Sequence, residues 1–187
     1  MEKSKIKTIQ INNQNFELIE IISEKQIKDR VKDISIEISR KFVSKDPVII
    51  GILNGSFVFL SDLIRKIDIN CELDFIKVSS YINTSSTGKI DLELKNKVKL
   101  SNREIIIVED IIDSGKTVSF LYKYFEKQNV KSISSVALLN KYQINKKKII
   151  LDWIGFNIED NFVVGYGLDY NNYFRNLKSI YKILNER

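Results

Sequence analysis

Apolar residues form two patterns that alternate along the chain. One is a spacing of three or four residues, typical of helices, and the other is a continuous run, typical of buried strands. From Glu24 every third or fourth residue is apolar, which predicts an amphipathic helix with Ser23 as its N-cap. The apolar positions of this helix are Ile27, Val31, Ile34, Ile38 and Phe42. By contrast, residues 48–53 and 105–108 are almost continuously apolar, as expected of parallel strands that are covered on both faces.

Further segments extend this alternation. Additional strands are predicted at residues 73–81, 132–139, 153–156 and 162–166. Two more helices are predicted, on the apolar positions Phe57, Leu60, Leu63, Ile64 and Ile67 and on Val118, Leu121, Tyr122 and Phe125. Residues 6–22 are expected to form a short peripheral β segment, and the pattern at 180–184 fits a strand or a helix equally well.

Strands that alternate with helices predict an α/β fold, here a single domain over residues 1–187 with a parallel sheet and helices on both faces. Ligands of such sheets bind beyond the carboxyl ends of the strands. The turns that follow predicted strands should meet there, and they lie at 54–55, 80–81, 113–117 and 140–141. The polar span 83–89 has no apolar periodicity, which predicts a mobile lid.

Composition narrows the chemistry. The net charge of +6 suits either nucleic acid or phosphorylated substrates, although scattered surface lysines also explain it because only Lys146–Lys148 forms a basic block. The single cysteine, Cys71, excludes a disulfide framework and is predicted to be a small buried residue in a protein of a reducing compartment. The absence of histidine excludes imidazole-based triads and His-ligated zinc. No signal peptide or membrane-spanning run is visible, so we expect a cytoplasmic location.

The segment 105–117 carries the most informative motif. A buried strand is followed by the acidic pair Glu109–Asp110 and by a polar turn, 113–117, that opens a helix. Free N–H groups at a helix start favour a phosphate, whereas two carboxylates repel it. A ligand with a phosphate at one end and a sugar diol or Mg²⁺ beside it resolves this conflict. A phosphorylated ribose fits.

Two other readings of this motif fail. A P-loop needs a glycine five positions before Gly115, and Asp110 stands there. A phosphoacceptor receiver domain would carry its acidic pair after the first strand, whereas about a hundred residues precede this pair. In addition, no later predicted strand ends in a suitable aspartate.

The segment Val108–Thr117 resembles the phosphoribosyl-diphosphate-binding signature of the type I phosphoribosyltransferases. Four other segments are similar to the purine-specific members of that family: Leu53–Phe57, Ser79–Tyr81, Leu138–Lys141 and Phe162–Arg175. The resemblance extends from about Ile22 to near the C-terminus, with the motifs in the family's order. It implies a parallel central sheet flanked by helices, with a small hood built from the terminal segments.

The resemblance also implies roles for the signature residues. Glu109 and Asp110 would hold the ribose hydroxyls and, directly or through water, Mg²⁺. The 5-phosphate would be wrapped by Ser114, Gly115, Lys116 and Thr117. Asp113 would face N7 of the purine and manage its proton, although its position also fits a helix N-cap.

For the purine, the resemblance implies that Lys141 reaches the 6-oxo group, which would reject adenine because a cation meets an amino group badly. Phe162 would stack on the base and Val163 would offer backbone groups to its edge. Asp169 would bind a second Mg²⁺ or support the base pocket. The simpler alternatives are a solvated strand-end lysine at 141 and ordinary core packing at 162.

For the diphosphate, the resemblance implies contacts from Arg175, Asn54, Gly55, Ser80 and Tyr81, with the Ser79–Lys89 loop closing over the site. The family commonly has a lysine where this chain has Asn54. If the backbone makes that contact, Asn54 preserves it. If the lysine charge contributes, affinity for the diphosphate is lower.

The implied activity is Mg²⁺-dependent transfer of the phosphoribosyl group from 5-phospho-α-D-ribose 1-diphosphate to N9 of hypoxanthine or guanine, by a homodimer or homotetramer. The alternative is a regulator of nucleotide synthesis genes that uses the same fold to bind nucleic acid. The base-site residues Lys141, Phe162 and Asp169 favour the enzyme, since a regulator need not keep them. Nucleic acid is therefore not an expected partner. Membranes are not expected partners either, because no membrane-spanning run is visible.

Overall fold

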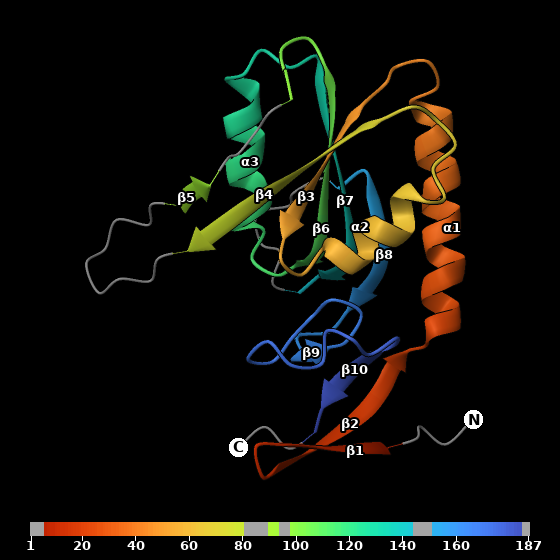
Figure 1. The fold of residues 1–187 in the computed structure, drawn as a ribbon, viewed down its shortest axis with the longest axis vertical. Coiled ribbons are helices and arrows are strands. Elements are labelled where there is room, and N and C mark those ends of the chain that lie inside the picture. Colours follow the sequence, from red (N-terminus) through yellow and green to blue (C-terminus); the bar gives the residue numbers. More distant parts are fainter. Residues whose placement is uncertain (1–5, 81–89, 94–97, 144–150, 185–187) are drawn as a thin grey trace.

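A computed structural model describes residues 6–80, 90–93, 98–143 and 151–184. Its larger sheet has six strands in the order β5-β4-β3-β6-β7-β8 (Figure 1). They are β3 (Val48–Leu53), β4 (Glu72–Ser80), β5 (Ile90–Glu93), β6 (Glu104–Ile112), β7 (Ser132–Lys141) and β8 (Trp153–Ile158). Five of these strands run parallel, and only β5 pairs antiparallel, with β4. The predicted parallel sheet is confirmed.

Helices cover both faces of this sheet, as predicted. They are α1 (Glu24–Lys41), α2 (Phe57–Ile64) and α3 (Lys116–Glu126). Because side chains alternate along a strand, Ile106 and Val108 of β6 pack in the core with α1 and α2, while Ile105 and Ile107 pack in the core beneath α3. All four are fully buried, which explains the continuous apolar run of this strand.

Helix α1 begins where the sequence places it. Ser23 accepts a hydrogen bond from the backbone of Gln26, and the Gln26 side chain accepts one from the backbone of Ser23, which completes a capping box. The apolar stripe of α1 is buried, including Phe42 just beyond the helix. No helix in the described part of the chain is long and apolar enough to cross a membrane.

A smaller antiparallel sheet lies beyond the carboxyl ends of the parallel strands and combines the two ends of the described chain (Figure 1). Its order is β1-β2-β10-β9, formed by Ile6–Ile11, Gln14–Ile22, Ile180–Ile183 and Val163–Val164. This sheet has its own core of Phe16, Leu18, Val164, Phe174 and Ile183. It is the expected hood, and it shows that 180–184 is a strand and not a helix.

Several details depart from the sequence-based expectation, and the strand predicted at 162–166 is limited to β9, Val163–Val164. Strand β6 continues through the acidic pair to Ile112, and the short strand β5 was not predicted. Helix α2 ends at Ile64, so Ile67 follows the helix, although it still packs against the core. Cys71 is half-buried against the same core. The predicted lid, 83–89, lies outside the described residues.

Candidate active site

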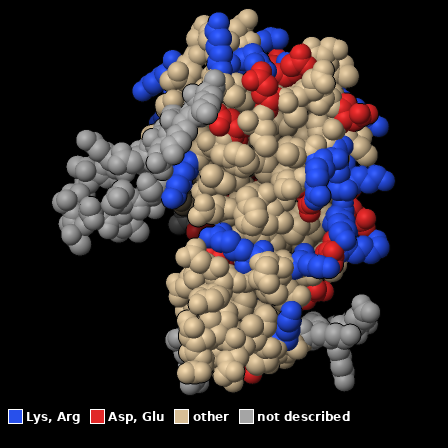
Figure 2. Space-filling model, viewed as in Figure 1, with Lys and Arg blue, Asp and Glu red and all other residues tan. Residues whose placement is uncertain are grey.

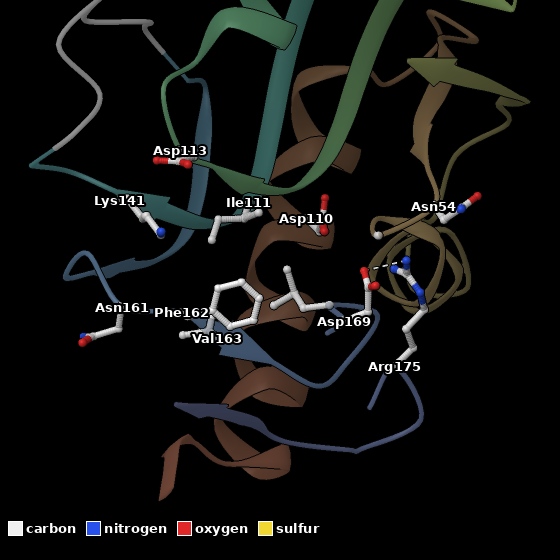
Figure 3. A pocket seen from close by; sticks show the side chains of 12 residues that line it. Asn54, Asp110, Ile111, Asp113, Lys141, Asn161, Phe162, Val163, Asp169 and Arg175 are labelled. Carbon is white, nitrogen blue, oxygen red and sulfur yellow. Dashed lines mark ion pairs between the residues drawn. The ribbon is translucent and has the colours of Figure 1, made fainter. Parts of the chain in front are cut away.

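The carboxyl ends of β3, β6 and β7 converge on one cavity of about 340 Å³ that faces the small sheet. Most of the predicted site residues line it (Figure 3). The lining residues are Asn54, Gly55, Asp110, Ile111, Asp113, Lys141, Asn161, Phe162, Val163, Leu168, Asp169 and Arg175. Residues far apart in sequence therefore meet where parallel-sheet topology predicts a ligand.

A smaller hollow of about 80 Å³ adjoins the start of α3. The turn residues Ser114, Gly115, Lys116 and Thr117 line it together with Glu109. Gly115 has φ of +70° and is the N-cap, so the chain turns into the helix through a conformation that favours glycine. The N–H groups of the first helical turn are thus available to an anion, as expected for a 5-phosphate.

Asp113 lies between these two spaces, because it lines both the cavity and the hollow. Its side chain is exposed, and the N-cap of α3 is Gly115, two residues later. The alternative of Asp113 as the helix N-cap is therefore wrong. Figure 3 shows Asp113 at the same end of the cavity as Lys141.

The acidic pair belongs to β6 itself, so its two side chains point to opposite sides of the strand. Asp110 lines the large cavity and Glu109 the small hollow. Burial raises the pKa of Asp110 to about 6, against the opposing effect of two backbone N–H groups and of Arg175. Burial, and then the charge of Asp110, raise the pKa of Glu109 well above its ordinary value. Among the described residues, Glu109 Oε2 is buried without a hydrogen-bond partner.

The Asn54–Gly55 turn forms one wall of the cavity at the end where Arg175 and Asp169 lie (Figure 3). The Leu53–Asn54 peptide is cis. A side chain at Gly55 would overlap the carboxylate of Asp110 and would have to displace it, so glycine leaves room for this carboxylate at the strand ends. Arg175 forms an ion pair with Asp169, with 2.6 Å between Nη2 and Oδ1, and donates a hydrogen bond to the carbonyl of Gly167.

The opposite end of the cavity combines a cation with an aromatic ring. Lys141 Nζ lies 3.0 Å from Asp160 Oδ1, and only 14% of the Lys141 side chain is exposed, which contradicts the solvated-lysine alternative. Phe162 is 42% exposed, so it is not an ordinary core residue. Its ring packs edge-on against Tyr170, with 5.8 Å between the ring centres. Val163 is buried beside it.

Two predicted site residues have side chains that the structure does not describe. Tyr81 lies outside the described residues, and the side chain of Ser80, at the end of β4, is not described either. Conversely, Asn161, Leu168 and Ile111 line the cavity but were not predicted. All three directly adjoin predicted site residues, and that adjacency was the only signal available.

Comparisons with known proteins agree with this geometry. Residues 19–171 match the phosphoribosyl transferase domain family. A hypoxanthine-guanine phosphoribosyltransferase from Bacillus subtilis is 43% identical over 161 residues, covering 86% of this chain and 89% of the relative. A hypoxanthine phosphoribosyltransferase from Buchnera aphidicola is 42% identical over 88% of this chain and 94% of its own.

Solved structures give the same result. The crystal structure of a hypoxanthine-guanine phosphoribosyltransferase from Bacillus anthracis superposes with a TM-score of 0.83 at 40% sequence identity, covering 88% of this chain and 98% of that one. Fold, cavity and sequence similarity thus lead to one assignment. The chain belongs to the hypoxanthine-guanine phosphoribosyltransferase family.

Proposed function

We propose that this protein is a purine salvage enzyme that transfers the 5-phosphoribosyl group from 5-phospho-α-D-ribose 1-diphosphate to N9 of hypoxanthine or guanine, releasing pyrophosphate. One observation carries the proposal. A single cavity has Arg175 and Asp169 at one end and Lys141 and Phe162 at the other, with Asp110 between them. The names of the relatives point to the same two bases.

The phosphoribosyl end rests on the turn before α3 and on the acidic pair. Backbone N–H groups of Ser114–Thr117 hold the 5-phosphate, and carboxyl oxygens of Glu109 and Asp110 accept hydrogen bonds from the ribose hydroxyls. The unpaired oxygen of Glu109 supports this role, since the described protein offers it no donor. Arg175 binds the leaving pyrophosphate, and its charge stabilises the negative charge that grows there.

The residues also fit a magnesium ion. The described residues contain no cluster of three or more potential metal ligands, but Mg²⁺ is commonly held by one or two carboxylates together with substrate phosphates. Asp110 and Asp169, which line the same cavity, would supply those carboxylates, with Glu109 acting through the ribose hydroxyls. When bound, Mg²⁺ would neutralise charge on the departing pyrophosphate.

The purine end selects a 6-oxo base. The Lys141 ammonium donates to the 6-oxo oxygen, whereas the 6-amino group of adenine offers it only donors. Phe162 stacks on the ring, and the backbone at Val163 meets the base edge. Asp113 faces N7 and takes or relays the purine proton as N9 attacks the sugar.

The decisive experiment supplies the purified protein with Mg²⁺, the sugar diphosphate and, in turn, hypoxanthine, guanine, xanthine or adenine. Nucleotide formation should be rapid with the first two bases and slow with adenine, and EDTA should abolish it. The absence of product with every purine would refute the proposal.

A matched variant tests the assignment of Asp113. Asp113→Asn should lower turnover by about a hundredfold or more, the usual size of a lost acid–base group. Calorimetric binding of pyrophosphate should stay close to that of the wild type, because Asp113 lies away from Arg175 in the cavity. Unchanged turnover would remove Asp113 from this role.

The nucleic-acid-binding alternative gains no support. Lys and Arg side chains are interspersed with Asp and Glu over the face shown in Figure 2 and do not form one continuous basic band there. We further propose that the enzyme acts in the cytoplasm. We also propose that it is a homodimer or homotetramer, and sedimentation of the purified protein would test this oligomeric state.

A further inference from the structure

The loop after β9 places two groups at the diphosphate end of the site. Asp169 closes this loop, and Gly167 provides the carbonyl that accepts a hydrogen bond from Arg175. Three successive residues of the loop have positive φ: Gly165 at +101°, Tyr166 at +51° and Gly167 at +101°. Such a conformation is uncommon for a bulky side chain, so the surrounding structure must hold Tyr166 in place.

The Tyr166 side chain is anchored to α2. It is buried, and its hydroxyl donates a hydrogen bond of 2.7 Å to Asp62 Oδ2. Asp62 belongs to the helix that begins directly after the Asn54–Gly55 turn, and its other oxygen pairs with Arg65. A hydrogen bond to a carboxylate is stronger than one between neutral groups. The Tyr166–Asp62 hydrogen bond therefore joins the loop that carries Asp169 to α2, the helix that follows the Asn54–Gly55 turn.

Close backbone packing reinforces this link. A side chain at Gly167 would overlap the carbonyl oxygen of Gly55, so the loop and the turn lie in direct contact. The loop is also bonded to the segment beyond it, since the N–H of Tyr166 donates to the carbonyl of Leu177 and that of Gly167 to the carbonyl of Arg175. A shift of Tyr166 relative to α2 would consequently displace Arg175 and Gly55 from each other.

Resting on the proposed function, we propose that the Tyr166–Asp62 hydrogen bond positions the diphosphate-binding groups. Tyr166 is not among the residues that line the substrate cavity. It lines a neighbouring cavity of about 470 Å³, which shares Arg175 with the first. Tyr166 is thus a positioning residue: it acts through Arg175 and Asp169 and touches no reacting atom.

The test removes the hydroxyl and keeps the ring. Tyr166→Phe should raise KM for the sugar diphosphate about tenfold, the cost of a lost charge-assisted hydrogen bond. KM for hypoxanthine should stay within twofold, because the hydrogen bonds described for Tyr166 lead to Asp62 and Leu177 and not to Lys141 or Phe162. Rises of equal size in both KM values, or a lowered melting temperature with both KM values unchanged, would overturn the proposal.

Partner variants separate the hydrogen bond from general packing. Asp62→Asn keeps an acceptor for the tyrosine and should retain most of the diphosphate affinity, whereas Asp62→Ala should match Tyr166→Phe. The double variant Tyr166→Phe/Asp62→Ala should be no worse than either single one. Arg65→Gln is the matched control: it removes the ion pair of Asp62 but leaves the tyrosine bond, so its KM values should equal those of the wild type. Additive effects of the two single changes would contradict the link.

A binding measurement distinguishes failure of this inference from failure of the proposed function. If the wild type forms no nucleotide with any purine, the proposed function is refuted, and calorimetric titration with pyrophosphate and Mg²⁺ still decides the role of Tyr166. A Kd about tenfold higher in Tyr166→Phe supports the positioning role. A Kd equal to that of the wild type refutes it.

Discussion

At the scale of single residues, Asp110 combines burial with a proposed role that needs its charge. Its raised pKa of about 6 means that, between about pH 4 and pH 6, the folded protein binds a proton here that the unfolded chain has released. Stability from the protonated form is therefore lost as pH rises through 6. Above that pH the ionised group destabilises the ligand-free fold by about 3 kcal/mol.

Asp110→Asn should consequently raise the melting temperature of the ligand-free protein at pH 8, by several degrees on the usual scale for a chain of this length. The gain should shrink at pH 5, where the wild-type carboxyl is protonated. Calorimetric unfolding at both pH values provides the measurement. Asp33→Asn, which changes an exposed carboxylate on α1, is the control. An equal gain at pH 5 and pH 8 would contradict the assignment.

The ion pair between Lys141 and Asp160 gives a second prediction. Asp160 holds the ammonium of a mostly buried lysine at the purine end of the cavity. Asp160→Asn keeps the shape but removes the charge, so KM for hypoxanthine should rise about threefold, near the upper range for a partly exposed pair. The preference for hypoxanthine over adenine should fall with it, and KM for the sugar diphosphate should not change.

The matched control for this pair is Glu159→Gln, which alters an exposed carboxylate one residue earlier. Steady-state kinetics with each substrate varied in turn would compare the two variants. If Asp160→Asn left the base KM unchanged, or raised both KM values equally, Asp160 would have no part in orienting Lys141.

At the scale of elements, the capping box at Ser23 stabilises the start of α1 without contributing to the site. Ser23→Ala removes the acceptor of the Gln26 N–H and should cost about 1 kcal/mol, which lowers the melting temperature by about 2–4 °C. Turnover should be unaffected. Thermal unfolding would check this, with Ser101→Ala in an exposed turn as the control. A loss of activity without a loss of stability would be the opposite result.

Most elements could be predicted because their own residues determine them. The stripe of α1 and the apolar runs of β3 and β6 follow from burial alone. The end of β6 does not follow from burial, because hydrogen bonds to β7 extend the strand through polar residues. Strand β5 is short and depends on pairing with β4, and the strand identity of 180–183 depends on β2 and β9.

The site residues also divide into those that the sequence could predict and those that it could not. The phosphate turn and acidic pair are contiguous in sequence, so their spacing carried the prediction, and the family resemblance added Lys141 and Arg175. Residues that line the cavity because of tertiary packing, such as Leu168, carry no motif of their own and are marked only by a predicted neighbour, here Asp169. The Tyr166–Asp62 bond spans 104 residues, and nothing in the sequence near either residue indicates it.

At the scale of the whole molecule, the two sheets support different parts of the proposed site, although Lys141 of the purine end stands on β7 of the larger sheet. The larger sheet supplies the acidic pair and the phosphate turn, while the small sheet carries Phe162 and Val163 at β9. Disturbing one core should therefore weaken one substrate more than the other. Leu18 is fully buried in the small core, and Leu121 lies equally buried beneath α3.

Leu18→Ala and Leu121→Ala form a matched pair for this idea, each expected to cost about 2–5 kcal/mol of stability. Leu18→Ala should raise KM for hypoxanthine more than KM for the sugar diphosphate, and Leu121→Ala should do the reverse. Kinetics below the melting temperature of both variants would measure the ratios. Identical ratios in the two variants would show that the sheets do not act separately.

The strand order of the small sheet also bears on how the enzyme is made. β10 lies between β2 and β9, yet it leaves the ribosome after both. The strands of the larger sheet, residues 48–158, emerge earlier and can pair while translation continues. A nascent chain halted before Ile180 would thus hold the phosphate turn but leave Val163–Val164 unpaired. The pairing that fixes Val163 and Val164, next to the proposed stacking residue Phe162, is therefore the last to form among the described strands.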